Sequence, residues 1–379
     1  MSTPTTRRLK ILENRRKDPI QWVSPNNFMT EPGEPIDPQE ILQNPAYTFY
    51  CFHPENDSVI FVESDDPKAV DTAPFYYQGQ AETAVSLVEM PFETFVNIGE
   101  QIPKPSNGLV IIHSVGRCGS TLLSKLLDSV STVHSLSEPD DWTQLVFLRQ
   151  KGDLSDKWFM DSLRASAQWR CKPRLGSPPD TVALKTRSEV LALADLMSKV
   201  FANDKHIFLY REGVSWMGSI IKNWSPDRDI YNEEKNRASE LSWSSTLPIV
   251  KEYIRPEKAM NPVQVRILAW ITCMEGYLQL REAGLDIIAA RFEELTGTPT
   301  ETLQALMEFC RIDGVDWSAV DDVLSRDSQA GTVFAQEVRK RNTIPYTESM
   351  KNDVREMIQT RPLLGSSEVI LPGTVGRSD

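Results

Sequence analysis

Cysteine is scarce in this 379-residue chain, and its five copies are scattered along the sequence: Cys51, Cys118, Cys171, Cys273 and Cys310. Neither a disulfide framework nor a zinc site has this spacing, which favours a reducing compartment. Long apolar runs are also lacking, both for a membrane span and for the core of a secretory signal. We therefore predict a cytoplasmic protein that does not bind membranes.

Positive charge is in short supply as well. Lysine and arginine number 41 against 53 acidic residues, which gives a net charge of −12. This balance argues against broad binding of nucleic acid or acidic membranes, so any anion site must be local. A basic run near the start is predicted to be a solvated tail; it contains Arg7, Arg8, Lys10, Arg15, Arg16 and Lys17.

A proline-containing boundary at residues 103–108 separates two regions with different sequence patterns. We predict that residues 1–105 form an accessory α+β module, with an extended or irregular stretch over residues 1–45. The pattern predicts a hairpin at Tyr47–His53 and Val59–Glu63, further strands at Phe75–Tyr77 and Ala84–Val88, and a helix at Phe92–Gln101.

Short apolar segments alternate with helical ones from Leu109 onward. This alternation predicts an α/β domain over residues 106–345, built on a doubly wound parallel sheet, followed by a C-terminal helix and tail at 346–379. The predicted strands are Leu109–His113, Thr132–Leu136, Val182–Lys185, His206–Tyr210 and Asp286–Arg291. The predicted helices are Ser120–Val130, Leu154–Trp169, Glu189–Phe201, Gly213–Asn223 and Val263–Ala283, with a helical lobe at 225–260.

The most informative stretch follows the first predicted strand of this domain. Gly116 and Gly119 allow a tight turn, Arg117 supplies a charge, and Ser120 and Thr121 offer hydroxyl donors at the start of a helix. Such a loop suits a phosphate-like anion. The lysine of an ATPase phosphate loop is missing, because Ser120 follows the second glycine.

A second candidate anion site follows a later strand. Arg211 comes directly after His206–Tyr210, and Ser219 lies about two helical turns further on. Because the carboxyl ends of parallel strands meet at one edge of a sheet, both anion sites are expected at the same edge.

Together these stretches resemble the sulfotransferases that use 3′-phosphoadenosine 5′-phosphosulfate (PAPS), over about residues 105–345. Arg117–Thr121 stands for the [KR]-[ST]-G-[ST]-[ST] loop, and Arg211 with Ser219 stands for the pair that binds the 3′-phosphate. Trp270 and Tyr277, followed by Ile288–Leu295, are similar to the family's long helix and its R-[YF]-E-[DE]-L strand end. The resemblance implies a P-loop nucleotide-binding fold and PAPS as co-substrate. The implied nucleotide-binding residues are Gly116, Arg117, Cys118, Gly119, Ser120, Thr121, Arg211, Ser219 and, in a C-terminal loop, Arg326.

The general base departs from the family's K-T-H pattern, since Lys185-Thr186-Arg187 ends in a guanidinium that stays protonated. Other branches use a glutamate after the second strand, and Glu138 matches that position. Glu138, Arg117 and Lys185 are therefore the candidate catalytic residues, with no metal expected. A structural ion pair is an equal alternative for Glu138, and His134 is a second candidate base.

Two other functions stay open at this point. One is an ATP-dependent kinase or NTPase with a divergent loop, and the other is an inactive homologue that only binds the nucleotide. The expected acceptor is a hydroxyl of a small molecule or sugar. The sequence does not indicate the oligomeric state of the protein. Four tryptophans are equally explained as acceptor-pocket or as core residues: Trp142, Trp158, Trp224 and Trp243.

Overall fold

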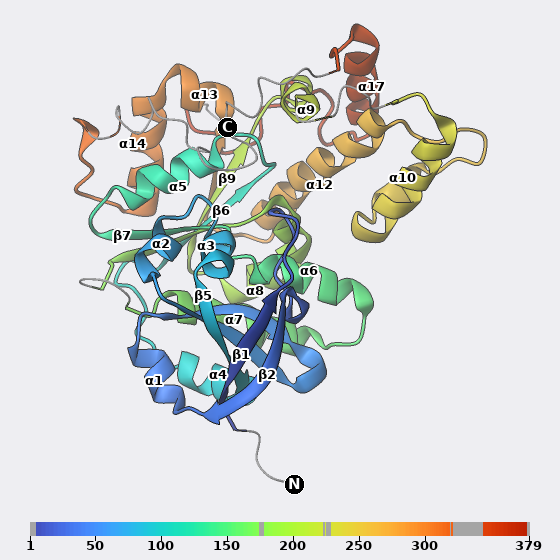
Figure 1. The fold of residues 1–379 in the computed structure, drawn as a ribbon. Coiled ribbons are helices and arrows are strands. Elements are labelled where there is room, and N and C mark those ends of the chain that lie inside the picture. Colours follow the sequence, from blue (N-terminus) through green and yellow to red (C-terminus); the bar gives the residue numbers. More distant parts are fainter. Residues whose placement is uncertain are drawn as a thin grey trace.

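The computed structural model describes residues 5–173, 178–222, 224, 229–318, 320 and 344–376. Two five-stranded sheets lie on either side of the expected boundary near residue 105, as Figure 1 shows. In the described part of the chain, no helix has both the length and the apolar character needed to cross a membrane.

The first sheet is antiparallel, with the strand order β2-β1-β5-β4-β3. Its strands are β1 (Arg7–Asn14), β2 (Phe28–Pro35), β3 (Tyr47–His53), β4 (Ser58–Ser64) and β5 (Ala84–Pro91). The accompanying helices are α1 (Pro38–Gln43), α2 (Pro67–Thr72), α3 (Tyr76–Glu82) and α4 (Phe92–Gly99), with 3-10 turns η1 (Pro25–Asn27) and η2 (Pro54–Asn56). The predicted hairpin, the strand after Ala84 and the helix after Phe92 are confirmed.

Two expectations for this region are wrong. The basic run is not a tail, because it begins as β1, which lies between β2 and β5 in the sheet. Here Arg7 pairs with Glu89 at 3.5 Å and Arg8 pairs with Glu40 at 3.1 Å. Carboxylates on neighbouring elements thus neutralise the charges that had suggested a solvated segment. Residues 75–77 form no strand but lead into α3, since burial of the aromatic rings overrides their strand propensity.

The second sheet is parallel throughout, in the order β10-β9-β6-β8-β7. Its strands are β6 (Leu109–Ser114), β7 (Val133–Ser137), β8 (Thr181–Lys185), β9 (Lys205–Tyr210) and β10 (Ile287–Arg291). Every residue of β6 is buried, as expected for a central strand covered on both faces. All five strands agree with the predicted segments to within one residue at each end.

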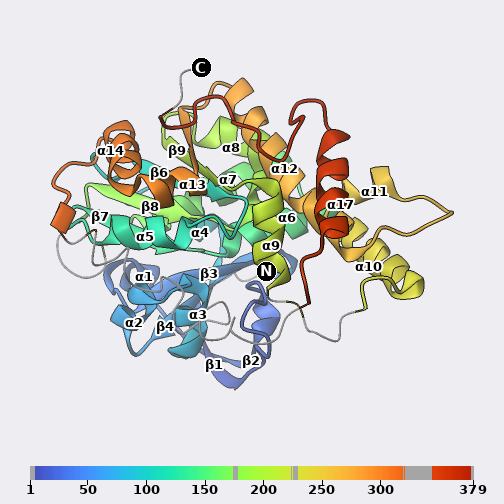
Figure 2. The same ribbon diagram turned by 90° about the horizontal axis from the view of Figure 1, so that it is seen from above.

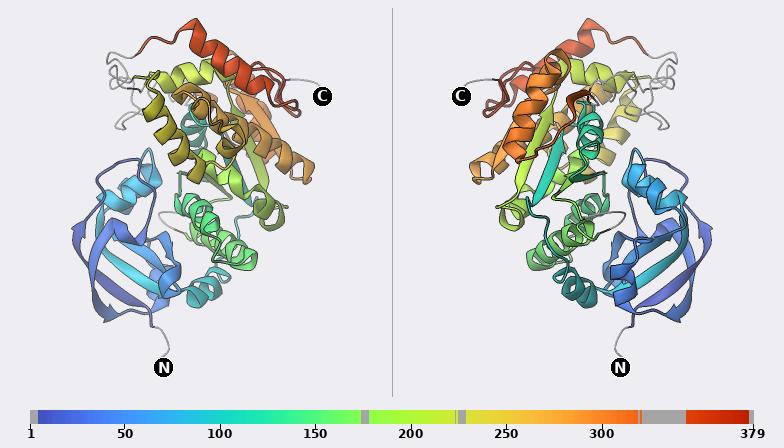
Figure 3. Two further views of the ribbon diagram at one scale, coloured as in Figure 1. Left: turned by 90° about the vertical axis from the view of Figure 1, so that its right-hand side faces the viewer. Right: turned by 90° about the vertical axis from the view of Figure 1, so that its left-hand side faces the viewer.

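Helices cover both faces of this sheet: α5 and α14 lie on one side, and α8 and α12 lie on the other (Figures 1 and 3). The helices are α5 (Ser120–Asp128), α6 (Asp141–Lys151), α7 (Asp156–Arg170), α8 (Ala194–Val200), α9 (Gly213–Ile221), α10 (Glu233–Thr246), α11 (Val250–Tyr253), α12 (Pro262–Glu282), α13 (Phe292–Gly297), α14 (Pro299–Cys310) and α17 (Glu348–Gln359), with the 3-10 helix η3 (Ser188–Leu193). The sequence did not predict α6. Seven of its eleven residues are buried, so it lacks the one-sided apolar pattern of a surface helix.

The first sheet lies beside the α/β part of the chain (Figure 2). Helices α6 and α7 contact strand β3 of this sheet and join it to the α/β part through polar contacts. At the edge strand β3, the side-chain amide of Gln144 donates to the carbonyl of Phe52 and accepts its N–H, both at 2.8 Å. Arg170, at the end of α7, pairs with Asp141 at 2.5 Å and donates to the carbonyl of Phe49 at 2.7 Å. These contacts fix the N-terminal sheet against the α/β part.

Candidate functional site

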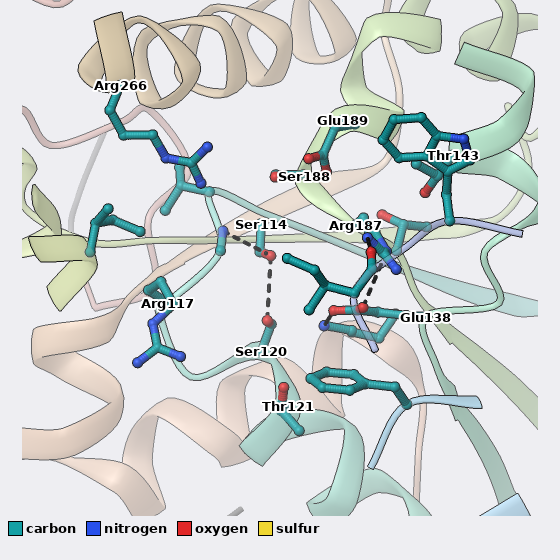
Figure 4. Close-up of a pocket in the computed structure, with 18 of the residues that line it drawn as sticks. Ser114, Arg117, Ser120, Thr121, Glu138, Thr143, Arg187, Ser188, Glu189 and Arg266 are labelled. Atoms are coloured by element: carbon teal, nitrogen blue, oxygen red, sulfur yellow. Dashed lines mark hydrogen bonds and ion pairs between the residues drawn. The ribbon is translucent and has the colours of Figure 1, made fainter. Parts of the chain in front are cut away.

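A cavity of about 1190 Å³ lies at the carboxyl ends of β6, β7, β8 and β9. It collects the glycine loop, Glu138, Lys185 and Arg211 from four separate strand ends, together with Ser219 of α9. Figure 4 shows Arg117, Ser120 and Thr121 on one side of this space and Glu138 with Arg187 on another. The parallel sheet therefore gathers at one place the residues that its sequence had suggested.

The glycine loop adopts a tight turn between β6 and α5. Left-handed conformations occur at Gly116 (φ 72°), Arg117 (φ 57°) and Gly119 (φ 86°). A Cβ at position 119 would lie 2.9 Å from Leu295, so glycine is required there by both conformation and space. The hydroxyl of Ser114 accepts the N–H of Gly116 at 3.2 Å and so holds the turn from below.

Cys118 faces away from the cavity. Its side chain is fully buried, and its thiol donates to the carbonyl of Leu209 at 3.2 Å. Burial raises the pKa of this thiol to about 11, so it stays protonated at neutral pH. Only the backbone of Cys118 is placed to contribute to an anion site, because the side chain packs against β9.

Arg211 follows β9 and borders the same cavity. Its Nε donates to the hydroxyl of Ser215 at 2.7 Å, and its guanidinium lies 4.3 Å from the centre of the Phe292 ring. Burial lowers the pKa of this guanidinium, which reflects a partly dehydrated cation. The indole of Trp270 donates to the Arg211 carbonyl at 2.9 Å, so α12 fixes the backbone at this strand end.

One indole joins the two candidate anion sites. Nε1 of Trp216, on α9, donates to the carbonyls of Val115 at 3.1 Å and Gly116 at 2.9 Å. The next turn of α9 carries Ser219, whose hydroxyl donates to the Trp216 carbonyl at 2.7 Å and which also lines the cavity. The glycine loop and the Arg211 end are thus linked through α9.

Glu138 comes directly after β7 and has a left-handed backbone conformation, with a φ of 59°. Its backbone N–H donates to the carbonyl of Lys185 at 2.7 Å. Its carboxylate forms an ion pair with the Lys185 ammonium and lies 3.4 Å from Nε of Arg187. Burial raises the pKa of Glu138, but the charges of Lys185 and Arg187 outweigh it and the net pKa is below the ordinary value of 4.5. The carboxylate is therefore ionised at neutral pH.

Arg187 ties this centre to the N-terminal module. Its Nε lies 2.8 Å from Asp140, and its Nη1 donates to the carbonyl of Ile20 at 3.0 Å. The other oxygen of Asp140 accepts the N–H of Val23 at 3.0 Å. Burial raises the pKa of Asp140 to about 7, although Arg187 opposes this change. Arg187 therefore holds the segment 18–26 against the site.

Sequence reasoning missed that this N-terminal segment forms a wall of the cavity. Ile20 and Trp22 line it, and the Trp22 ring stacks on Phe147 of α6 with centroids 4.2 Å apart. Arg266 of α12 was missed too, and Figure 4 shows it reaching into the cavity. A single charge inside the apolar run of residues 262–271 was the one signal that could have revealed it.

Several alternatives from the sequence are placed by the structure outside the cavity. His134, the second candidate base, lies 4.0 Å from Asp71 and does not line the cavity. Trp142 and Trp158 pack within the core, whereas Trp224 and Trp243 line the cavity. Arg326 lies outside the described residues.

Among the described residues, no cluster of three histidine, cysteine, aspartate or glutamate side chains could hold a metal ion.

Comparison with known proteins gives matches among solved structures only. No family model matches the chain, and no curated protein matches it. A sulfotransferase from Alicyclobacillus acidocaldarius is 11% identical, with 57% of this chain and 84% of that chain covered and a TM-score of 0.36. A sulfotransferase from Mycobacterium avium is 12% identical, with 73% and 80% covered and a TM-score of 0.37. At these values the likeness assigns neither a family nor an activity to this chain.

Proposed function

We propose that this protein is a sulfotransferase that moves a sulfuryl group from PAPS to a hydroxyl of a small-molecule or sugar acceptor. The observation that carries the proposal is the shared cavity. It brings two separate anion-binding elements, the loop at 116–121 and Arg211 with Ser219, together with a carboxylate–lysine pair. Two anion elements suit a nucleotide that is phosphorylated at both its 3′ and 5′ positions.

The residues of the chain divide the reaction between them. Arg117 and the loop amides hold the 5′-phosphosulfate, and Arg211 and Ser219 hold the 3′-phosphate. Glu138 accepts the proton of the acceptor hydroxyl while the oxygen of that hydroxyl forms a bond to sulfur. The bond between sulfur and the 5′-phosphate oxygen breaks, and its electron pair stays on that oxygen next to Arg117. Lys185 keeps Glu138 ionised, which is the state that a base requires.

A nucleotide-binding protein without transferase activity is the second candidate. The observation that favours it is the pairing of Glu138 with both Lys185 and Arg187, since those charges also lower the proton affinity of the carboxylate. In this alternative, the same cavity binds adenosine 3′,5′-bisphosphate but transfers nothing.

Calorimetry against adenosine 3′,5′-bisphosphate, ADP and ATP, with and without Mg²⁺, tests the nucleotide part of the proposal. We expect the bisphosphate to bind more tightly than ADP or ATP, independently of Mg²⁺. Arg211→Ala should weaken its binding by about 10- to 100-fold, the range for a hydrogen-bonded charge. Arg255→Ala serves as the control, because Arg255 bonds the carbonyls of Glu252 and Ile254 and does not line the cavity.

Transfer is measured separately, by mass spectrometry of a panel of hydroxyl compounds incubated with PAPS and the protein. A gain of one sulfuryl group by any member of the panel supports the sulfotransferase. Tight bisphosphate binding without transfer supports the second candidate. A preference for ATP with Mg²⁺ excludes both and points to a kinase or NTPase.

A further inference from the structure

Arg266 is a cation that the proposed donor site does not use. It lies in the second turn of α12, and its guanidinium stands 5.2 Å from the ring centre of Trp243 and 5.9 Å from that of Trp216. Its Nε is buried without a hydrogen-bond partner. Within the part of the chain that the structure describes, Arg266 has no ion pair.

The acidic group that acts on Arg266 does not neutralise its charge by contact. Glu189 acts on Arg266 electrostatically, but no ion pair joins them, and its carboxylate accepts the hydroxyl of Ser188 at 3.1 Å. Burial lowers the pKa of Arg266, which shows that the cation is poorly hydrated. A partly dehydrated cation without an acidic partner is costly, so an arginine facing a cavity is suited to pair with an anion of a ligand.

The size of the cavity leaves space for a second ligand beside the nucleotide. Its volume of about 1190 Å³ exceeds the range of roughly 300–1,000 Å³ that is typical of a single-ligand pocket. The nucleotide already has the loop at 116–121 and Arg211 for its two anionic ends. Arg266 comes from a different element and lies beside Trp243. The aromatic rings of Trp22 and Phe147 line another part of the same cavity.

We propose that Arg266 binds a carboxylate on the acceptor, whose apolar ring rests against these aromatic side chains. The guanidinium offers two parallel N–H donors to a carboxylate, while Trp243 covers one side of the cation. The proposal rests on the proposed function and narrows it: the acceptor is an aromatic hydroxy acid. Glu189, the facing carboxylate, disfavours ligands whose anion lies on its side of the cavity.

The test compares 4-hydroxyphenylacetate with its methyl ester, which lacks the negative charge and is larger by one methyl group. Their binding is measured by calorimetry on the full chain saturated with adenosine 3′,5′-bisphosphate. We expect the carboxylate to bind about 10- to 100-fold more tightly than the ester. Arg266→Gln should abolish this preference and Arg266→Lys should keep part of it, whereas Arg255→Gln, outside the cavity, should leave it intact. Circular dichroism and thermal unfolding check that each variant folds.

Three results would overturn the assignment. The two ligands could bind equally to the wild-type protein, or the preference could survive in Arg266→Gln. Alternatively, Arg266→Gln could weaken adenosine 3′,5′-bisphosphate as much as Arg211→Ala does, which would place Arg266 in the donor site. Failure of sulfuryl transfer is a separate result: if the preference depends on Arg266 but nothing is transferred, the anion site stands and the proposed function fails.

Discussion

Lys185 and Glu138 act on each other, and this coupling changes what each side chain can do. The lysine neutralises a mostly buried carboxylate that would otherwise be costly to ionise. The carboxylate in turn directs the ammonium group to the edge of the sheet where the glycine loop ends. An ion pair and a proton acceptor are thus compatible at this position, and only kinetics separates the two roles.

Replacing Glu138 by glutamine tests the base directly. We expect kcat to fall by about 100- to 1000-fold, because a positioned base typically contributes that much, while the affinity for adenosine 3′,5′-bisphosphate is unchanged. In the wild-type protein the pKa of Glu138 lies below 4.5, so the carboxylate is ionised at higher pH and the acid limb of kcat/KM should lie below that value. Full activity of the variant would remove Glu138 from this role.

Residue spacing revealed the candidate residues of the proposed donor site but not those of the proposed acceptor site. Arg117 and the pair Arg211 and Ser219 could be identified because each follows a recognisable strand at a fixed offset. Arg266 and Asp140 could not, because their significance depends on contacts between elements far apart in the sequence. A lone arginine in an apolar helix has the same sequence appearance whether it faces a cavity or a partner.

At the scale of elements, α9 and the glycine loop form one unit through Trp216. Trp216→Phe keeps an aromatic ring, although a smaller one, and removes the two hydrogen bonds to the carbonyls of Val115 and Gly116. We expect about 1–3 kcal/mol lower stability in urea unfolding and weaker adenosine 3′,5′-bisphosphate binding in calorimetry. Unchanged nucleotide affinity in a destabilised variant would show that the indole supports the fold but not the donor site.

Arg170 of α7 forms a buried charge pair with Asp141 of α6 and also donates to the carbonyl of Phe49 in the N-terminal sheet. Arg170→Met leaves Asp141 buried without its partner, which typically costs about 3–5 kcal/mol in the free energy of unfolding. Adding Asp141→Asn should recover part of this loss, because the orphaned charge is then gone. Arg164→Met, on the exposed face of the same helix, is the matched control. Equal urea midpoints for Arg170→Met and the control would contradict this account.

Elements with a clear hydrophobic pattern were predicted well, and elements without one were not. The buried strands of the parallel sheet were evident as short apolar runs, with bounds close to those observed. Helix α6 and strands β1 and β2 were missed, since α6 is buried on most sides and β1 carries charges that its neighbours neutralise. In both cases tertiary contacts supply what the local sequence does not show.

For the whole molecule, a buried histidine pair links stability to pH. His113 and His206 stack in the core with ring nitrogens 3.1 Å apart, and burial lowers the pKa of both, to about 4 for His206. The unfolded chain therefore binds more protons between pH 6.5 and about 4, so stability is lost as the pH falls through this window. His206 alone should account for roughly 3 kcal/mol.

Urea unfolding at about pH 7 and about pH 5 measures this dependence. We expect the free energy of unfolding to fall on acidification in the wild-type protein and to fall less in His206→Gln, which cannot take up the proton. His53→Gln is the control, because His53 lies at the end of β3 and is partly exposed. A variant with an unchanged pH slope would show that other groups dominate acid unfolding.

The two hydrogen bonds between the Gln144 side chain and the backbone of Phe52 have a consequence for self-association. Strand β3 is an edge strand of the N-terminal sheet. The unpaired backbone N–H and C=O groups of an edge strand can pair with a strand of another molecule and so extend the sheet. Here a glutamine side chain imitates one residue of a sixth strand and saturates that position from the neighbouring helix. An incoming chain would first have to displace this amide, so intermolecular strand growth is discouraged by the same contact that unites the two halves of the protein.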